Sequence, residues 1–214
     1  MDLYNLRQSY TKGSFSEADL ADSPFAQFET WFEAAKSCDL EEPNAMCLAT
    51  ADAEGAPSTR IVLLKAFSEK GLTFFTNYES RKSNQIAENS RVAANFLWLP
   101  LQRQVNVSGV VSKLSHDESK EYFDSRPRGS RLGAIVSPQS RTIPDRAFLE
   151  KRLDALEEKW AGRQVEMPDY WGGFRIAPLR FEFWQGRPNR LHDRFAFERP
   201  TIESLEWHVT RLAP

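Results

Sequence analysis

The sequence predicts a mainly β fold with flanking helices, and three features lead to this prediction. Short apolar and β-branched runs follow one another between residues 45 and 114, with turn-forming segments between them. A second group of such runs occupies the end of the chain, after residue 170. The Gly-rich fingerprints of dinucleotide-binding and P-loop proteins are missing. Antiparallel strands at such short intervals favour a barrel over a doubly wound sheet.

Length and composition indicate one domain over residues 23–214, preceded by a polar segment over residues 1–22. The 214 residues are 41% apolar and 27% charged, as in ordinary globular proteins. A net charge of −2 argues against a broad nucleic-acid surface. The two cysteines and three histidines lack zinc-ligand spacing, so we expect no metal site. Without a signal peptide or an apolar run near the ~20 residues of a membrane span, we expect a cytoplasmic protein that does not enter membranes.

The predicted elements start with an amphipathic helix. Ser23 and Pro24 provide an N-cap and a first-turn proline, and Phe25, Phe28 and Phe32 follow at helical spacing. The strands expected next cover residues 45–50, 58–65, 72–77, 92–98 and 104–114.

The run Arg60–Lys65 and the run Thr73–Asn77 are predicted to be neighbouring antiparallel strands, since a turn signal separates them. Ser80 then resembles the N-cap of a helix whose first turn contains Arg81 and Lys82. Cations are disfavoured at the positive end of a helix unless an anion binds between them and the free N–H groups. This arrangement predicts a phosphate site.

A second cationic cluster follows a helix that opens with the capping box Ser115–Glu118. The segment Arg126–Arg131, expected to be a loop, holds three arginines and Ser130. It is consistent with a solvated surface loop or with a second phosphate site. A further helix is expected from Asp145 to about Trp160.

The last third returns to strands, expected over residues 179–185, 190–195 and 207–212. Alternation along the second of these places Arg190, His192 and Arg194 on one face. An exposed basic face is one interpretation. The flanking aromatic residues Trp184 and Phe195 favour a face that meets a ligand.

Taken in this order, the motifs resemble those of the pyridoxamine 5′-phosphate oxidase family, flavin enzymes that make pyridoxal 5′-phosphate. The resemblance runs from about Leu6 to Pro214, and Arg-Leu-His-Asp-Arg with the Ala-Pro terminus is its most specific part. The matching runs are Arg60–Lys65, Phe74–Asn77, Ser80–Lys82, Arg103–Val105, Ser125–Arg128, Gln139-Ser140, Trp171–Arg175, Glu182–Gly186, Arg190–Arg194 and Arg211–Pro214. The family implies an FMN-binding split β-barrel and a homodimer with FMN at the interface.

The resemblance also implies site residues. The implied FMN contacts are Arg60, Ile61, Val62, Leu63, Leu64, Lys65, Phe75, Thr76, Arg81, Lys82, Gln104, Gln139, Ser140, Trp184 and Arg194. The implied substrate contacts are Arg7, Tyr10, Lys65, Tyr122, Arg126, Ser130, Arg190 and His192. Of these, Arg190 and His192 would face the substrate ring as the catalytic pair, and residues 1–22 would form a lid. Phe75 stands where the family often has tyrosine, so a hydroxyl contact to FMN would be lost.

The implied reaction oxidises pyridoxamine or pyridoxine 5′-phosphate to pyridoxal 5′-phosphate, with oxygen as the acceptor and hydrogen peroxide released. Two phosphate groups, one on FMN and one on the substrate, would explain the two cationic sites. Arg60 and Lys65 are an odd number of residues apart, so a regular strand would direct their side chains to opposite faces. One regular strand therefore cannot direct both at the same phosphate. The alternatives are a split-barrel flavoprotein acting on another substrate and a non-catalytic carrier of a vitamin B6 phosphate. A third alternative, a nucleic-acid binder, conflicts with the net charge of −2.

Overall fold

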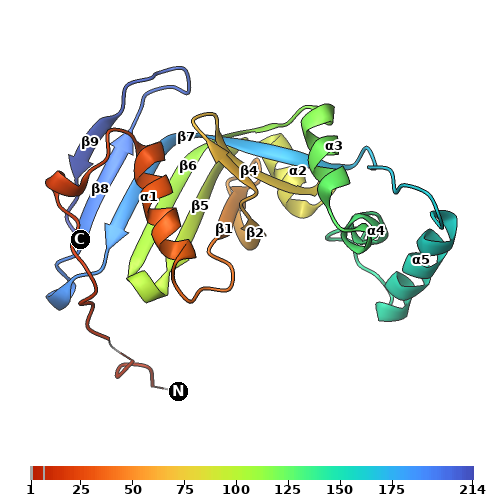
Figure 1. Ribbon diagram of the computed structural model, residues 1–214, viewed down its shortest axis with the longest axis horizontal. Coiled ribbons are helices and arrows are strands. Elements are labelled where there is room, and N and C mark those ends of the chain that lie inside the picture. Colours follow the sequence, from red (N-terminus) through yellow and green to blue (C-terminus); the bar gives the residue numbers. More distant parts are fainter. Residues whose placement is uncertain (1, 7) are drawn as a thin grey trace.

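One antiparallel sheet runs through the computed structural model, which describes residues 2–6 and 8–214 (Figure 1). Its strands follow the order β2-β1-β5-β6-β7-β4-β3, and β8 and β9 extend it beside the second half of β7. The strands are β1 (Ala45–Ala51), β2 (Pro57–Leu63), β3 (Ala66–Ser68), β4 (Gly71–Asn77), β5 (Arg91–Trp98), β6 (Arg103–Lys113), β7 (Trp171–Gln185), β8 (Asp193–Glu198) and β9 (His208–Arg211). The helices are α1 (Pro24–Lys36), α2 (Arg81–Glu88), α3 (His116–Ser125), α4 (Arg128–Val136) and α5 (Arg146–Lys159), with 3-10 turns at Glu17–Asp19, Leu99–Leu101 and Pro188–Arg190.

Strand β7 pairs with different neighbours along its length. Its first half lies between β6 and β4, and its second half lies between β6 and β8. The change coincides with a register shift opposite Gly109, where Pro178 cannot donate a backbone hydrogen bond. A Cβ at Gly109 would lie 2.1 Å from the Ala177 carbonyl oxygen, so only glycine permits this approach.

The sheet curls until its two ends meet near residue 65. The backbone N–H of Lys65 donates to the Thr73 carbonyl at 2.8 Å, although β2 itself pairs with β1. The curled sheet forms a half-barrel with flanking helices, which confirms the predicted fold class.

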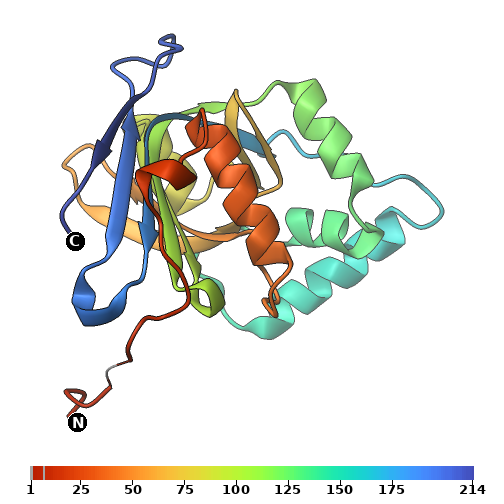
Figure 2. The ribbon, with the colours of Figure 1, turned by 60° about the vertical axis from the view of Figure 1, so that its left-hand side comes forward.

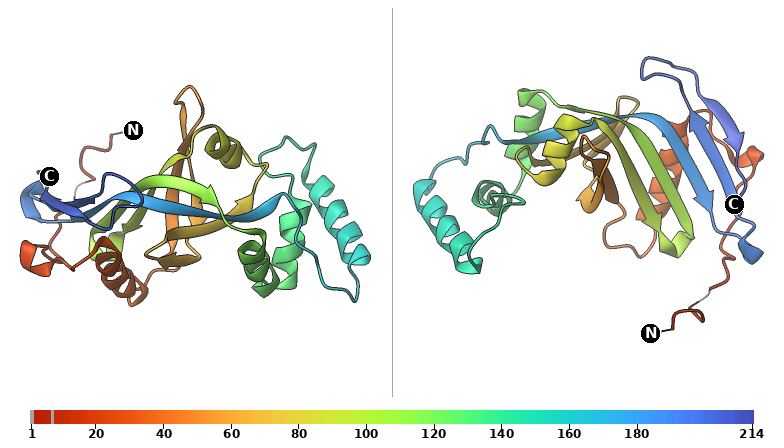
Figure 3. Two further views of the ribbon diagram at one scale, coloured as in Figure 1. Left: turned by 90° about the horizontal axis from the view of Figure 1, so that it is seen from above. Right: turned by 180° about the vertical axis from the view of Figure 1, so that it is seen from behind.

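Helices cover both sides of the sheet. Figure 3 shows α1 and α2 on opposite sides. Helix α1 begins as predicted, because the Ser23 hydroxyl accepts the Ala26 N–H at 3.1 Å, and it buries Phe28 and Trp31 in the main core. Helices α3, α4 and α5 gather at one end of the molecule (Figure 2) around a smaller core centred on Phe123 and Trp171.

The N-terminal segment joins the main core at Phe15, whose side chain is only 2% exposed. Two residues later, Glu17 forms an ion pair with Arg211 of β9 at 2.7 Å. The boundary after residue 22 and the lid role of residues 1–22 stay predictions.

Three local predictions were wrong. Residues 60–63 of the run Arg60–Lys65 pair with β1, Lys65 alone bonds to β4, and only the short β3 beyond it forms a hairpin with β4. The segment expected to be an arginine-rich loop starts α4 at Arg128. Arg190 and His192 lie in a turn before β8 because Asn189 and Arg190 have positive φ angles of 56° and 62°, which a strand does not accommodate.

Within the described residues, no helix has the length and apolar character needed to cross a bilayer.

Candidate functional site

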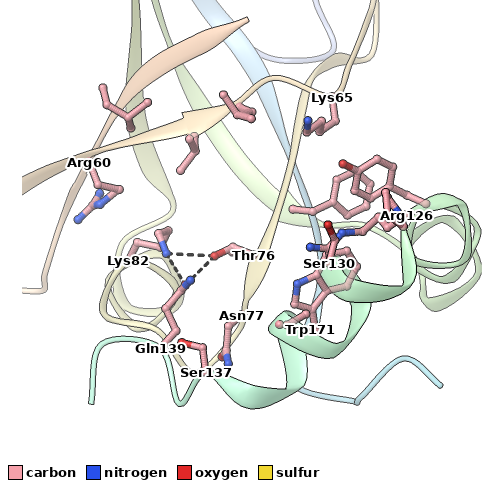
Figure 4. A pocket seen from close by; sticks show the side chains of 18 residues that line it. Arg60, Lys65, Thr76, Asn77, Lys82, Arg126, Ser130, Ser137, Gln139 and Trp171 are labelled. Atoms are coloured by element: carbon pink, nitrogen blue, oxygen red, sulfur yellow. Dashed lines mark hydrogen bonds between the residues drawn. The ribbon is translucent and has the colours of Figure 1, made fainter. Parts of the chain in front are cut away.

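A cavity of about 790 Å³ lies where the two ends of the curled sheet meet, between β2, β4 and helices α3 and α4 (Figure 4). Most of its lining was predicted from sequence. The predicted residues that line it are Arg60, Ile61, Val62, Leu63, Lys65, Phe75, Thr76, Lys82, Tyr122, Arg126, Ser130 and Gln139. In Figure 4, Arg60 and Lys82 lie toward one end, whereas Lys65, Arg126 and Ser130 lie toward the other.

Lys82 dominates the first end. Its side chain is buried in the first turn of α2, whereas the neighbouring Arg81 is exposed. The ammonium donates to Gln139 Oε1 at 2.7 Å, Thr76 Oγ1 at 3.0 Å and Ser80 Oγ at 3.2 Å. All three acceptors are neutral, so the positive charge has no direct compensation. Burial, followed by the charge of Arg60, lowers the pKa of Lys82 from 10.5 to about 8.

Arg60 adds a second cation from the edge strand β2. Its guanidinium donates to Thr50 Oγ1 at 2.7 Å and to Ser58 Oγ at 2.6 Å, and these bonds fix its orientation. Burial and then the charge of Arg81 lower the pKa of Arg60. Across residues 2–6 and 8–214, no carboxylate forms an ion pair with Arg60, Lys82 or Arg126. Lys82 is buried and the other two are half-buried, so without a counter-ion their charges are costly, and a bound anion relieves that cost.

Arg126 is the central cation of the second end. It follows the last residue of α3, and its guanidinium lies 4.8 Å from the centre of the Trp171 ring. Burial lowers the pKa of Arg126. Its Nη1 atom is buried without a hydrogen-bond partner, which leaves a donor available for a ligand. Tyr122, one helical turn earlier, stacks on Phe75 with ring centres 3.9 Å apart, so Phe75 fills space beside the tyrosine.

Arg190 and His192 do not line this cavity. They lie with Tyr10 at a separate cavity of about 490 Å³. There the rings of Trp184 and His192 are 4.5 Å apart, and Tyr10 meets each of them edge-on at 5.7 Å. The backbone N–H of Arg187 donates to Nδ1 of His192 at 3.0 Å, so neutral His192 carries its proton on Nε2. Burial, and then the charge of Arg190, lower the pKa of His192.

Three further predicted residues form a row across adjacent strands. Gln104 of β6 pairs with Trp184 of β7, which pairs with Arg194 of β8. Arg194 is held by Glu182 at 2.7 Å and by the Ala213 carbonyl at 2.7 Å. None of the three lines the cavity between β2 and α4.

The remaining predicted residues are more scattered. Arg81 and Ser140 line a neighbouring cavity of about 420 Å³. Leu64 is buried in the core and does not line the main cavity. Arg7 lies outside the described residues.

Sequence reasoning missed several residues that shape the site. Trp171 stacks under Arg126, and Thr50 and Ser58 orient Arg60. The Trp171–Arg175 motif could have identified Trp171 as a site residue. The roles of Thr50 and Ser58 depend on strand pairing, which the sequence did not indicate.

Comparison with known proteins identifies the family. Residues 32–160 match the family model described as pyridoxamine 5′-phosphate oxidase, and residues 171–214 match the model described as the pyridoxine 5′-phosphate oxidase C-terminal dimerisation region. A pyridoxine/pyridoxamine 5′-phosphate oxidase from Crocosphaera subtropica is 55% identical over the full length of both chains.

Two solved structures share the fold. PhzG from Burkholderia lata, in complex with tetrahydrophenazine-1-carboxylic acid, has a TM-score of 0.88 at 26% identity, covering 96% of this chain and all of its own. A pyridoxamine 5′-phosphate oxidase-related, FMN binding protein from Nostoc punctiforme has a TM-score of 0.70 at 16% identity, covering 91% of this chain and all of its own. The full-length sequence match and the two adjoining family models agree, so the chain belongs to the pyridoxamine 5′-phosphate oxidase family.

Proposed function

We propose that the protein is an FMN-dependent oxidase that converts pyridoxamine or pyridoxine 5′-phosphate to pyridoxal 5′-phosphate. Oxygen accepts the electrons, hydrogen peroxide is released, and the reaction serves vitamin B6 biosynthesis and salvage. The observation that carries the proposal is one cavity with two separate, uncompensated cationic ends. A phosphorylated cofactor and a phosphorylated substrate, bound with their rings between these ends, would satisfy both.

FMN phosphate is assigned to the end formed by Arg60 and Lys82. The donor chemistry fits, because a dianion there would compensate the buried Lys82 and the half-buried Arg60 and meet the amide of Gln139 and the hydroxyl of Thr76. Arg81 reinforces the positive potential from the first turn of α2. The chain from Ile61 to Lys65 would border the isoalloxazine ring along one side of the cavity.

The substrate phosphate is assigned to the end formed by Lys65, Arg126 and Ser130, with Tyr122 beside them. The unpartnered Nη1 of Arg126 is the donor that supports this assignment. The stack of Arg126 on Trp171 fixes the guanidinium plane before a ligand arrives, which reduces the entropy lost on binding.

The homodimer completes the site in this proposal. Arg190, His192, Trp184 and Arg194 all fall within residues 171–214, the part matched by the dimerisation-region model. Since they do not line the cavity of their own chain, a second copy would supply them to it. The row formed by Gln104, Trp184 and Arg194 would then face FMN, and the 490 Å³ cavity at Tyr10 and His192 would meet the substrate ring.

The protein's own chemistry in this reaction is binding and orientation. FMN, when bound, supplies the two-electron oxidation. Arg190 would stabilise negative charge on the substrate ring, and the Nε2–H of neutral His192 would donate a hydrogen bond to it. Tyr10 would cover the ring and exclude water.

Two alternatives differ in measurable ways. PhzG shares the fold and was solved with tetrahydrophenazine-1-carboxylic acid, which has no phosphate group, so a split barrel acting on another substrate is an alternative. The cationic end at Arg126 favours a phosphorylated substrate. A non-catalytic B6-phosphate carrier would have no use for the second cationic end at Lys82.

A flavin spectrum tests the proposal directly. The purified, FMN-loaded protein should be yellow, and anaerobic addition of pyridoxamine 5′-phosphate should bleach it. Unphosphorylated pyridoxamine at the same concentration serves as the matched control and should bleach it far more slowly. Equal bleaching by both compounds would remove the phosphate assignment, and no bleaching by either would remove the proposed activity.

We also propose a cytoplasmic location. The two free, half-buried thiols Cys38 and Cys47 support it, because oxidising compartments outside the cytoplasm favour disulfides.

A further inference from the structure

Asp193 connects three segments of the chain at one point. It is the first residue of β8 and directly follows His192, and its side chain is 16% exposed. Its Oδ2 accepts the backbone N–H of Phe15 at 3.0 Å and lies 3.5 Å from Nη1 of Arg187. Its Oδ1 accepts from Nη1 of Arg211 at 3.1 Å. No step of the proposed reaction uses this carboxylate.

The first segment that Asp193 holds is the turn bearing the catalytic pair. Asn189 and Arg190 both have left-handed backbone conformations, which are uncommon for non-glycine residues and more so for arginine than for asparagine. Arg187 closes this turn by donating its backbone N–H to the His192 ring, and its side chain reaches Asp193. The carboxylate therefore fixes the residue that orients His192.

The second segment is the irregular N-terminal stretch that carries Tyr10. Gln102 Oε1 accepts the backbone N–H groups of Thr11 and Lys12 at 2.8 and 3.0 Å, and Asp193 accepts that of Phe15. Asp193 alone among these anchors also contacts the turn that holds His192. The edge contact between Tyr10 and His192 depends on both segments being in place.

We propose that Asp193 is a positioning residue that locks the Arg187–His192 turn to the N-terminal segment, so that His192 and Tyr10 face the substrate ring together. The inference rests on the proposed function in assigning His192 to the substrate ring. It extends that function by naming a residue that acts on the substrate only through others.

A double-mutant cycle tests this role. Asp193→Asn keeps the side-chain shape but loses the charge that holds Arg187 and Arg211. In the FMN-loaded enzyme, it should lower the rate of anaerobic flavin reduction by saturating pyridoxamine 5′-phosphate by about 10- to 100-fold, with the FMN dissociation constant changed less than about 2-fold. In a His192→Ala background the same substitution should cost less than about 3-fold, because the group it positions is already gone.

Glu17→Gln is the matched control for these kinetics. It weakens the same ion-pair cluster through Arg211 without contacting Arg187, so it should change the reduction rate less than about 2-fold. An undiminished effect of Asp193→Asn in the His192→Ala background, or an equal effect of Glu17→Gln, would overturn the proposal.

A second measurement needs no substrate. Trypsin cleavage after the exposed Lys12 in the FMN-loaded protein should be at least about 5-fold faster in Asp193→Asn than in the wild type, since the N-terminal segment opens more often. Asp154→Asn, on the exposed face of α5, is the control and should cleave at the wild-type rate. Unchanged cleavage in Asp193→Asn would refute the link between the two segments. If pyridoxamine 5′-phosphate fails to reduce the wild-type flavin, the proposed function fails, and the cleavage result still decides the role of Asp193.

Discussion

Replacing Lys82 by methionine should have opposite effects on the apo-protein and on FMN binding. Lys82 is a buried ammonium with three neutral partners and a neighbouring Arg60. Without an anion, its charge destabilises the folded state. With the FMN phosphate bound, the same charge becomes a strong attraction. Methionine preserves the length and packing of the side chain and removes both effects.

The expected magnitudes follow from the pKa and from the contacts. The pKa of Lys82 falls from 10.5 to about 8. A shift of this size corresponds to roughly 3 kcal/mol, and we discount it to about 1–2 kcal/mol because the side chain keeps some contact with solvent. The apo-protein of Lys82→Met should therefore melt about 2–6 °C higher at pH 7. A hydrogen bond to a charged group contributes about 1.5–3 kcal/mol, so FMN should bind roughly 10- to 150-fold more weakly.

The pH dependence of the melting temperature gives a further check that the Lys82 charge destabilises the apo-protein. Because the folded-state pKa of Lys82 is below its unfolded value, the destabilisation is fully present below about pH 8. It is relieved as the pH rises from about 8 toward 10.5, where the folded apo-protein already holds a neutral amine. The difference in melting temperature between Lys82→Met and the wild type should shrink over that range.

Thermal melts of the apo-proteins and fluorescence titrations with FMN measure both effects. Lys151→Met removes an exposed lysine of α5 and should change neither quantity. The reasoning is refuted if Lys82→Met lowers the apo melting temperature while FMN affinity is unchanged.

Three other substitutions probe the remaining parts of the site. Arg126→Met should raise the KM for pyridoxamine 5′-phosphate by about 10- to 100-fold while FMN stays bound, because a charged donor to the substrate phosphate is lost; an unchanged KM in steady-state assays would place that phosphate elsewhere. Arg190→Ala combined with His192→Ala should lower kcat by at least about 100-fold and leave the yellow FMN spectrum intact, and normal turnover would contradict the ring-facing assignment. Gly186→Ala would place a Cβ 2.8 Å from the Tyr10 ring, so it should displace the ring and raise KM several-fold; crystals showing Tyr10 unmoved would contradict this.

Local signals in the sequence were sufficient for many elements of this protein. Hydrogen-bonded caps at Ser23, Ser115 and Asp145 start α1, α3 and α5 where predicted, because capping depends on a few neighbouring residues. Strands β1, β4, β5 and β6 lie within one residue of the predicted ranges. The two cationic clusters were also visible in the sequence, since the cations of each lie within a few residues of one another.

The sequence did not predict the pairings between distant segments. The prediction that the strand at Arg60 pairs with β4 was wrong, because closure of the sheet near Lys65 depends on the path of the whole half-barrel. The prediction of a strand at Arg190 was wrong because two left-handed residues interrupt it, and nothing in their side chains requires that conformation.

The sequence by itself determined the family resemblance, the half-barrel class and the residue types of the two predicted phosphate sites. Only the tertiary structure divided those residues into two groups, with Lys82 and Arg126 in one cavity and Arg190 and His192 in another. It also revealed Asp193 as the junction between the N-terminal segment and the His192 turn. Periodicity specifies which face of an element a residue occupies, whereas the distance between two elements is set by how the whole sheet curls and packs.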